Sequence, residues 1–186
     1  MTLAARKAVA REEAALRRAA AHDLHRAAAS DRLRAHLSEQ AGRVIAGYLP
    51  IRSEADPLPT MEALAARNRV VVPVVTVARQ PLVFREWRPG CRLVQGVFGV
   101  MVPADGAELV PDLIIAPLLA FDRKMHRLGY GGGFYDRTLA QLRKNGRIEA
   151  LGFAYAAQGV AAVPVEATDE PLDAVLTESG VVPLAP

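Results

Sequence analysis

The stretch DLIIAPLLAFDRKMHRLGYGGGFYDRTLAQLRKNG, residues 112–146, decides the fold. It opens with an apolar run that is typical of a buried strand. A charged loop follows, in which four of the five residues 129–133 are glycines. The last part predicts an amphipathic helix with Leu139 and Leu142 on one side and Gly146 as its cap. A strand, a glycine-rich loop and a helix in this order indicate an α/β fold.

The flanking sequence extends this alternation of strands and helices in both directions. A segment rich in Ala, Arg, Glu and Leu predicts an N-terminal helix over about residues 4–40, ended by Gly42. Further expected elements are strands at 44–49, 69–75, 81–87, 148–155 and 172–178, and a helix at 57–68. Continuous apolar runs at 70–72 and 113–115 fit strands that are covered on both faces. We therefore predict a single three-layer α/β/α domain over residues 1–186, with a largely parallel central sheet.

Composition narrows the classes of partner. The chain has 186 residues, of which 51% are hydrophobic and 23% charged, as in a globular domain. The net charge is only +3, and the arginines are spread along the whole chain. A nucleic-acid binder gathers its positive charge on one face, so small anionic ligands are the favoured partners over nucleic acid.

The sequence also indicates in which cellular compartment the protein acts. The single cysteine, Cys91, allows no internal disulfide, which fits a reducing compartment. Charges at Arg6, Lys7 and Arg11 interrupt any apolar core that a secretory signal would need. The longest apolar stretch, 113–121, falls far short of the ~20 residues of a membrane span and contains Pro117. We expect a cytoplasmic protein with no membrane partner.

The glycine loop has the features of a phosphate site. Glycines let the backbone approach an anion closely, and the N–H groups at the following helix start point at it. The loop has neither the Lys-Ser/Thr of a P-loop nor the spacing of G-x-G-x-x-G. Arg123, Lys124 and Arg127 supply positive charge, and Asp136 could hold a magnesium ion that bridges phosphates. The alternatives are a tight turn and an Asp136 that only stabilises the helix N-terminus.

The motifs identify a family resemblance. Seven residues lie in the register of the signature of the 5-formyltetrahydrofolate cyclo-ligase family: Arg127, Leu128, Gly129, Gly131, Gly133, Tyr135 and Asp136. The chain resembles that family over almost its whole length. Lys7 and Arg11 match its N-terminal Lys-x-x-x-Arg, and YLPIRSEAD (48–56) matches its Tyr-x-Pro and Glu-x-Asp. Gln158, VPVEATDEPLD (163–173) and Thr177-Glu178 match its C-terminal motifs.

The resemblance implies a fold and an activity. The fold is similar to the NagB/RpiA/CoA-transferase-like fold, and the reaction uses ATP and Mg²⁺ to convert 5-formyltetrahydrofolate into 5,10-methenyltetrahydrofolate. ADP and phosphate are released. Phosphoryl transfer onto the formyl oxygen makes that oxygen a good leaving group, and N10 of the same folate then closes the ring. The partners are thus small molecules, and we expect a monomer or a weak homodimer.

The resemblance also implies residue roles. The ATP-binding residues are Lys7, Arg11, Arg127, Leu128, Gly129, Tyr130, Gly131, Gly132, Gly133, Phe134 and Tyr135. Arg127, Tyr135 and Asp136 are the catalytic candidates, Asp136 and Asp169 the magnesium ligands, and Leu49 and Glu54 the residues that face the folate. Without the resemblance, Lys7 and Arg11 would be a solvated helix face, and Glu54 and Asp169 would be loop carboxylates. Phe84 and Trp87 either flank a flat ring or belong to the core.

Four positions depart from the family pattern. Ala10 stands for a leucine, Met125 for a glycine, Val102 for a glutamate and Thr168 for a histidine. None removes a charge assigned to ATP or magnesium. Two alternative functions stay open: a non-catalytic folate- or nucleotide-binding relative, and a sugar-phosphate isomerase-like enzyme that needs no ATP.

Overall fold

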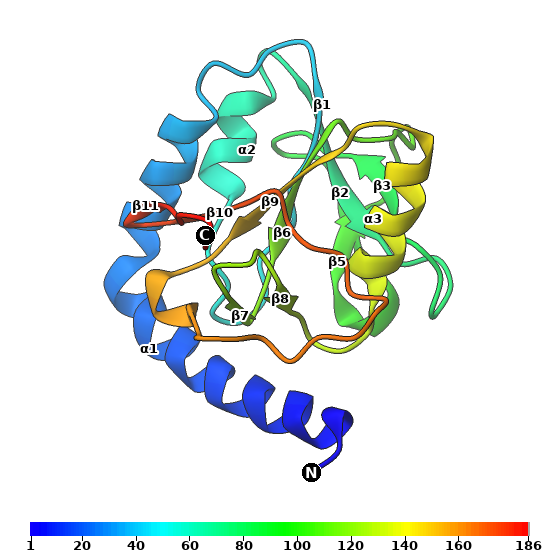
Figure 1. Ribbon diagram of the computed structural model, residues 1–186. Coiled ribbons are helices and arrows are strands. Elements are labelled where there is room, and N and C mark those ends of the chain that lie inside the picture. The colour runs from blue at the N-terminus through cyan, green and yellow to red at the C-terminus, as the bar shows by residue number, and fades with distance from the viewer. Residues whose placement is uncertain (186) are drawn as a thin grey trace.

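A computed structural model describes residues 1–185 as three layers around one sheet (Figure 1). Helices α1 (Leu3–His36) and α2 (Leu58–Leu64) cover one face of the sheet, and α3 (Phe134–Asn145) covers the other. The central strands are β1 (Val44–Ala46), β2 (Arg69–Val74), β3 (Val83–Glu86), β6 (Leu113–Pro117), β9 (Glu149–Phe153), β10 (Ala174–Thr177) and β11 (Gly180–Val181). The predicted three-layer α/β/α architecture is confirmed.

The seven-stranded sheet has the order β11-β10-β9-β6-β1-β2-β3. The five inner strands are parallel, and the two edge strands, β3 and β11, are antiparallel. After β1 the chain proceeds to β2 on one side, and it later returns to place β6 on the other side of β1. The strand order therefore reverses between β1 and β6. In open α/β sheets, ligands bind at the carboxyl ends of the strands at such a point.

Alternate residues of each parallel strand fill two separate cores. Ile45, Leu113 and Ile115 pack under α1 and α2 in one cluster, while Ala46 and Ile114 pack under α3 in the other. All five side chains are fully buried. Continuous apolar sequence is the consequence, because a strand between two helical layers has no solvent face.

The N-terminal helix ends earlier than predicted. Thr2 caps its start, with the Oγ1 atom accepting from Ala5 N at 3.3 Å. Its last residue is His36 and not residue 40, because Leu37 leaves the helical region and the chain turns before Gly42, which has φ 69°. A 34-residue helix without Gly or Pro still spans one whole side of the molecule.

Other elements are also shorter than the sequence suggested, including β3, β9 and β10, which were predicted over 81–87, 148–155 and 172–178. Strand β1 ends at Ala46 and not at residue 49, and α2 ends at Leu64 and not at residue 68. Asn68 nevertheless closes α2, since its Nδ2 donates to Leu64 O at 3.1 Å. None of the helices in residues 1–185 has the length and apolar character to cross a membrane.

The sequence did not predict two small hairpins outside the main sheet. They are formed by β4 (Leu93–Gln95) with β5 (Met101–Pro103), and by β7 (Ala120–Phe121) with β8 (Arg127–Leu128). The 3₁₀ turns η1 (Val97–Gly99) and η2 (Ala156–Gln158) were also missed. Strands of two or three residues are too short to show an alternating hydrophobic pattern in the sequence. They are defined by their hydrogen bonds instead.

Candidate functional site

The candidate residues converge at the carboxyl ends of β1 and β6. The chain leaves β1 into the loop that holds Leu49 and Glu54, and it leaves β6 into the β7–β8 hairpin and the glycine loop. Helix α1 passes beside both, because Arg11 bonds Gly129 of the glycine loop and Arg18 bonds Ser53 of the loop after β1. Three segments that are far apart in sequence therefore meet at the point where the strand order reverses.

Each of the three consecutive glycines is favoured at its position for a structural reason. Gly131 and Gly133 adopt φ of 98° and 63°, which L side chains rarely adopt. Gly132 has no such φ, but a Cβ there would lie 2.7 Å from the ring of Phe134. Gly133 is also the N-cap of α3, and no side chain of residues 1–185 caps the first N–H groups of that helix. This arrangement leaves those donors and the positive end of the helix dipole for an anion.

Arg11 lies against this loop and Lys7 lies against residues 166–169, so the two are not a solvated face. Arg11 Nε donates to Gly129 O at 2.9 Å, and a Cβ on Gly131 would lie 3.1 Å from its guanidinium. Lys7 is buried, and its Nζ lies 2.7 Å from Asp169 Oδ2 and 2.9 Å from Glu166 Oε1. Burial alone would lower the pKa of Lys7, but these two carboxylates raise it, so the ammonium stays charged.

Arg127 and Asp136 form the centre of the loop. Arg127 Nη2 donates to Asp136 Oδ1 at 2.6 Å, and the same oxygen accepts the backbone N–H of Glu170 at 3.1 Å. Asp169 is the residue before Glu170, so this hydrogen bond links the two predicted magnesium ligands, Asp136 and Asp169. The Asp136 side chain is 25% exposed and that of Asp169 is 21% exposed, so both reach solvent.

These two carboxylates fit a magnesium ion that is shared with phosphates. Within residues 1–185 no group of three His, Cys, Asp or Glu side chains forms an all-protein metal cage. Magnesium in nucleotide sites is commonly held by one or two carboxylates, with phosphate oxygens and water completing the shell. Asp136 Oδ2 and Asp169 Oδ1 make no hydrogen bond to another described residue, which leaves one oxygen of each for a metal.

Tyr135 is half-buried in the first turn of α3. Burial raises the pKa of its hydroxyl far above the ordinary value, and the charge of Glu54 raises it further. The phenol is therefore neutral at every physiological pH and acts as a hydrogen-bond donor. Leu128, which follows Arg127, is buried in a small cluster with Ala14, and this contact ties the loop to α1.

Glu54 is a buried carboxylate with a defined set of neighbours. Its Oε2 accepts the backbone N–H of Ile51 at 2.9 Å, and its Oε1 accepts the hydroxyl of Tyr130 at 3.1 Å. Burial raises its pKa, while the Ile51 N–H and the Arg18 guanidinium act to lower it. Tyr130 thus links the glycine loop to the loop after β1. The other predicted folate-facing residue, Leu49, packs partly buried against the core beside α1.

Aromatic residues near the site divide into core and exposed groups. Phe84 and Trp87 belong to the two buried cores and offer no free ring face to a ligand. Phe98, which the sequence did not single out, is 70% exposed and its ring centroid lies 6.1 Å from that of Phe134. Its φ of 60° is rare for a bulky residue, and the glycines on either side at 96 and 99 were a sequence signal for this turn.

Asp122 is a further residue that sequence reasoning left without a role. It is buried and accepts from the N–H groups of Lys124 and Val163, both at 2.9 Å, and from the backbone and ring of His126. Burial works against the charge, but these donors lower the pKa of Asp122 below the ordinary value. Together they fix the hairpin that delivers Arg127, and Met125 in that hairpin has φ 64°, where a glycine would be unstrained.

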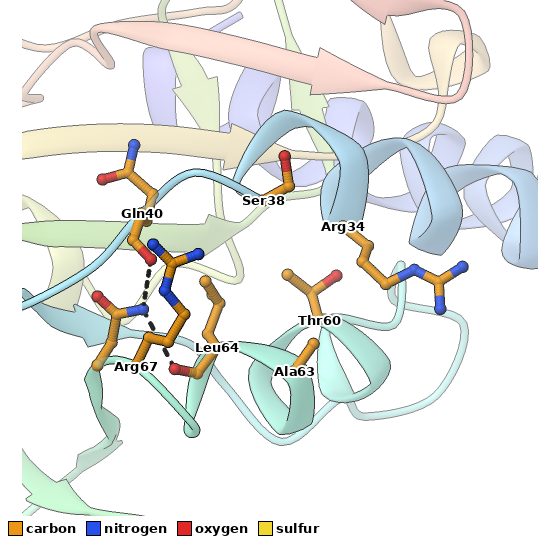
Figure 2. A pocket seen from close by; sticks show the side chains of 8 residues that line it. Arg34, Ser38, Gln40, Thr60, Ala63, Leu64 and Arg67 are labelled. Atoms are coloured by element: carbon orange, nitrogen blue, oxygen red, sulfur yellow. Dashed lines mark hydrogen bonds between the residues drawn. The ribbon is translucent and has the colours of Figure 1, made fainter.

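A separate pocket lies away from these residues. It has a volume of about 160 Å³ and lies between the end of α1 and α2, with lining residues that include Arg34, Ser38, Thr60 and Arg67 (Figure 2). The side chain of Asn68, which also lines the pocket, donates to the carbonyls of Gln40 and Leu64. The carbonyl ends of two helices face this region, which disfavours an anion there. We assign it no chemistry.

Comparison with known proteins gives one consistent result. The model of the 5-formyltetrahydrofolate cyclo-ligase family matches residues 3–178. A 5-formyltetrahydrofolate cyclo-ligase of Escherichia coli K12 is 38% identical over 144 residues, which cover 74% of this chain and 79% of that protein. The one from Haemophilus influenzae is 34% identical and covers 73% and 76%.

Solved structures agree with the fold. The NMR structure of Aquifex aeolicus 5,10-methenyltetrahydrofolate synthetase has a TM-score of 0.78 at 28% identity, and the match covers 97% of this chain and 93% of that one. A 5,10-methenyltetrahydrofolate synthetase from Mycoplasma pneumoniae has a TM-score of 0.70 at 23% identity and covers 91% and 96%, which supports the fold alone.

Proposed function

This chain belongs to the 5-formyltetrahydrofolate cyclo-ligase family, and from that premise we propose that it converts 5-formyltetrahydrofolate into 5,10-methenyltetrahydrofolate with ATP. The γ-phosphoryl group passes from ATP to the formyl oxygen, and ADP leaves. N10 of the folate then attacks the formyl carbon and releases its proton to solvent. The C–O bond breaks, and phosphate leaves with the oxygen and its bonding electrons.

The chain's task in this reaction is to position two substrates and to balance phosphate charge. No protein nucleophile is required, because the attacking atom belongs to the substrate. Catalysis then depends on alignment, on exclusion of water and on neutralisation of the transferred phosphoryl group. Helix α1, the glycine loop and the loop after β1 meet at one edge of the sheet, which supports this role for the protein.

We assign the nucleotide to the glycine loop and α1. The N–H groups at the start of α3 face the phosphates, with Lys7, Arg11 and Arg127 as cations around them. Residues 128–135 form the wall of this site. Tyr135 stays neutral and donates a hydrogen bond to the phosphates.

The folate is assigned to the loop after β1. Glu54 accepts N–H groups of the pterin, and Leu49 supplies an apolar contact. The exposed ring of Phe98 beside Phe134 offers a face on which a flat ring can stack. Tyr130 connects the two halves of the site, because it belongs to the nucleotide loop and bonds Glu54.

Asp136 and Asp169 would hold magnesium next to the phosphates. When bound, the ion neutralises charge that develops on the phosphoryl oxygens. Arg127 keeps Asp136 oriented toward that position, and Lys7 does the same for Asp169. We also propose that the protein acts in the cytoplasm as a monomer or a weak homodimer, with small molecules as its partners.

The single observation that carries the proposal is that α1 contacts the glycine loop through Arg11 and the magnesium candidate Asp169 through Lys7. The stoichiometry of the reaction tests it. We expect one ADP and one phosphate to be released for each methenyl group formed. Calorimetry that shows binding of 5-formyltetrahydrofolate, with no ADP release when ATP and Mg²⁺ are added, would favour the non-catalytic relative instead. Turnover of a sugar phosphate without ATP would favour the isomerase.

A further inference from the structure

Arg18 is a buried cation at the junction of the two substrate loops. It lies on α1, its side chain is 2% exposed, and it is among the largest fully buried side chains of the protein. Its Nε donates to Ser53 Oγ at 3.2 Å. Its Nη1 is buried and, within residues 1–185, has no hydrogen-bond acceptor. Arginine is almost never fully buried unless it is paired, so this placement needs a partner.

The partner that faces this guanidinium is Glu54. Arg18 Nη1 lies 3.7 Å from Glu54 Oε1, and Glu54 itself is 4% exposed. The other carboxylate oxygen is fixed by Ile51 N–H. Removing a carboxylate from water is costly unless a cation and hydrogen bonds compensate. Arg18 supplies the buried cation for a residue whose charge the pterin site needs.

Arg18 also contacts the glycine loop. Its Cζ lies 5.4 Å from the ring centroid of Tyr130, and Arg52 approaches the same ring at 5.9 Å. Both distances lie within the range of cation–π attraction. Because the hydroxyl of Tyr130 donates to Glu54 Oε1, the three side chains form one connected group.

We infer that Arg18 is a positioning residue of the folate site, which holds Glu54 charged and correctly oriented and seats Tyr130 beside it. The inference rests on the proposed role of Glu54 in binding the pterin. Arg18 acts through Glu54, and nothing in its placement requires contact with the substrate.

Removal of the Arg18 cation should change how folate binding depends on pH. The charged and titratable side chains that face Glu54 are Arg18, Arg52, Tyr48, Tyr130 and Tyr135. Burial raises the pKa of all three tyrosines, so they stay neutral. Without Arg18, the hydrogen bonds from Ile51 N–H and the Tyr130 hydroxyl and the exposed Arg52 still oppose the burial that raises the pKa of Glu54, but the buried cation is lost. The carboxylate would then be protonated at higher pH, and folate binding would fail earlier on acidification.

Calorimetry of 5-formyltetrahydrofolate binding tests this inference in the full chain. For Arg18→Met we expect the Kd to rise about ten-fold at neutral pH, and the acid limit of binding to move up by about one pH unit. Arg18→Lys should recover part of both losses. Arg17→Met is the matched control: this neighbour is partly exposed, pairs with Glu13 at 3.9 Å and should leave the Kd and its pH dependence unchanged.

A double-mutant cycle separates positioning from a general loss of structure. If Arg18 acts through Glu54, then Arg18→Met should add little to the Kd in a Glu54→Gln background. The double variant also removes both buried charges, so it keeps the test available if Arg18→Met alone folds poorly. An Arg18→Met penalty of the same size in both backgrounds, with no shift of the acid limit, would overturn the inference.

The turnover assay distinguishes a failure of the proposed reaction from a failure of the proposed role of Arg18. Wild-type protein that binds 5-formyltetrahydrofolate but forms no product contradicts the proposed reaction, while the binding measurements still decide the role of Arg18. Wild-type turnover combined with an unchanged Kd in Glu54→Gln contradicts the inference alone.

Discussion

At the scale of single residues, the two predicted magnesium ligands are held by cations from other segments. Arg127 bonds Asp136, and Lys7 bonds Asp169, although Lys7 and Asp169 are 162 positions apart. Each carboxylate keeps one oxygen for a metal. Positive charge for phosphate and negative charge for its metal are therefore placed side by side, as phosphoryl transfer requires.

Asp136→Asn tests this arrangement. The change removes one negative charge and leaves Arg127 without its ion-pair partner, so we expect turnover to fall by about 10-fold or more and the magnesium requirement to rise by a similar factor. Turnover measured over a magnesium titration checks it. Asp31→Asn is the control, because Asp31 pairs with Arg34 on the exposed face of α1. Full activity of Asp136→Asn at limiting magnesium would show that the role is misassigned.

Met125 is a second residue at which the direction of a stability change on substitution can be predicted. Its φ of 64° favours glycine, but its side chain is 4% exposed and packs in the core under α3. Relief of backbone strain is worth about 1 kcal/mol, while loss of a buried methionine side chain costs about 2–5 kcal/mol. We expect Met125→Gly to lower the free energy of unfolding by about 2 kcal/mol in urea titrations. Unchanged or higher stability would contradict this account of the packing.

At the scale of elements, the start of α3 depends on the close approach of Gly132 to Phe134. An alanine at 132 would push its Cβ into the ring, which also packs near Phe98 and under Arg137. We expect Gly132→Ala to raise KM for ATP by about 10-fold, within the roughly 100-fold that a 1 Å displacement can cost. Gly146→Ala, at the other end of α3, is the control, because its Cβ would meet no described atom within 4 Å and its backbone is extended. Equal KM values for the two variants would count against the loop geometry.

The β7–β8 hairpin depends on Asp122, and its contribution should vary with pH. The folded-state pKa of Asp122 is lowered, so its stabilisation is present above the unfolded-state pKa and is lost as the pH falls through the folded-state value. We expect Asp122→Asn to cost about 2–3 kcal/mol at neutral pH, with the difference from wild type closing below about pH 4. Urea unfolding at several pH values measures it.

An exposed aspartate provides the control for that series. Asp105 is 83% exposed and lies 3.9 Å from Arg92, so Asp105→Asn should change stability little at any pH. A difference between wild type and Asp122→Asn that stays constant from neutral to acidic pH would mean that the charge of Asp122 is not what stabilises the hairpin.

The elements also show how far sequence reasoning reaches. Apolar runs such as 113–115 predicted the inner strands, and Leu139 with Gly146 predicted α3, because burial on two faces and a helix cap leave clear local signals. The exact ends of α1 and β1 were missed, because α1 closes in a local turn at Leu37 and strand β1 ends at Ala46 although Gly47 still bonds Val71. Arg18, Asp122 and Phe98 escaped notice because their roles appear only when remote loops are brought together.

At the scale of the whole molecule, the site follows from topology. The order β9-β6-β1-β2 places the loops after β6 and β1 next to each other, and α1 crosses both from outside the sheet (Figure 1). The family resemblance predicted which residues would gather there. The strand order, which explains why they gather, is a property of long-range pairing and could not be taken from local periodicity.

The most direct test of the central claim is the absorbance of the methenyl product. Purified protein should form the 5,10-methenyltetrahydrofolate chromophore from 5-formyltetrahydrofolate when ATP and Mg²⁺ are both present, and it should form none when ATP is withheld. Folded protein that forms no chromophore in the complete mixture, or that forms it equally without ATP, would contradict the account.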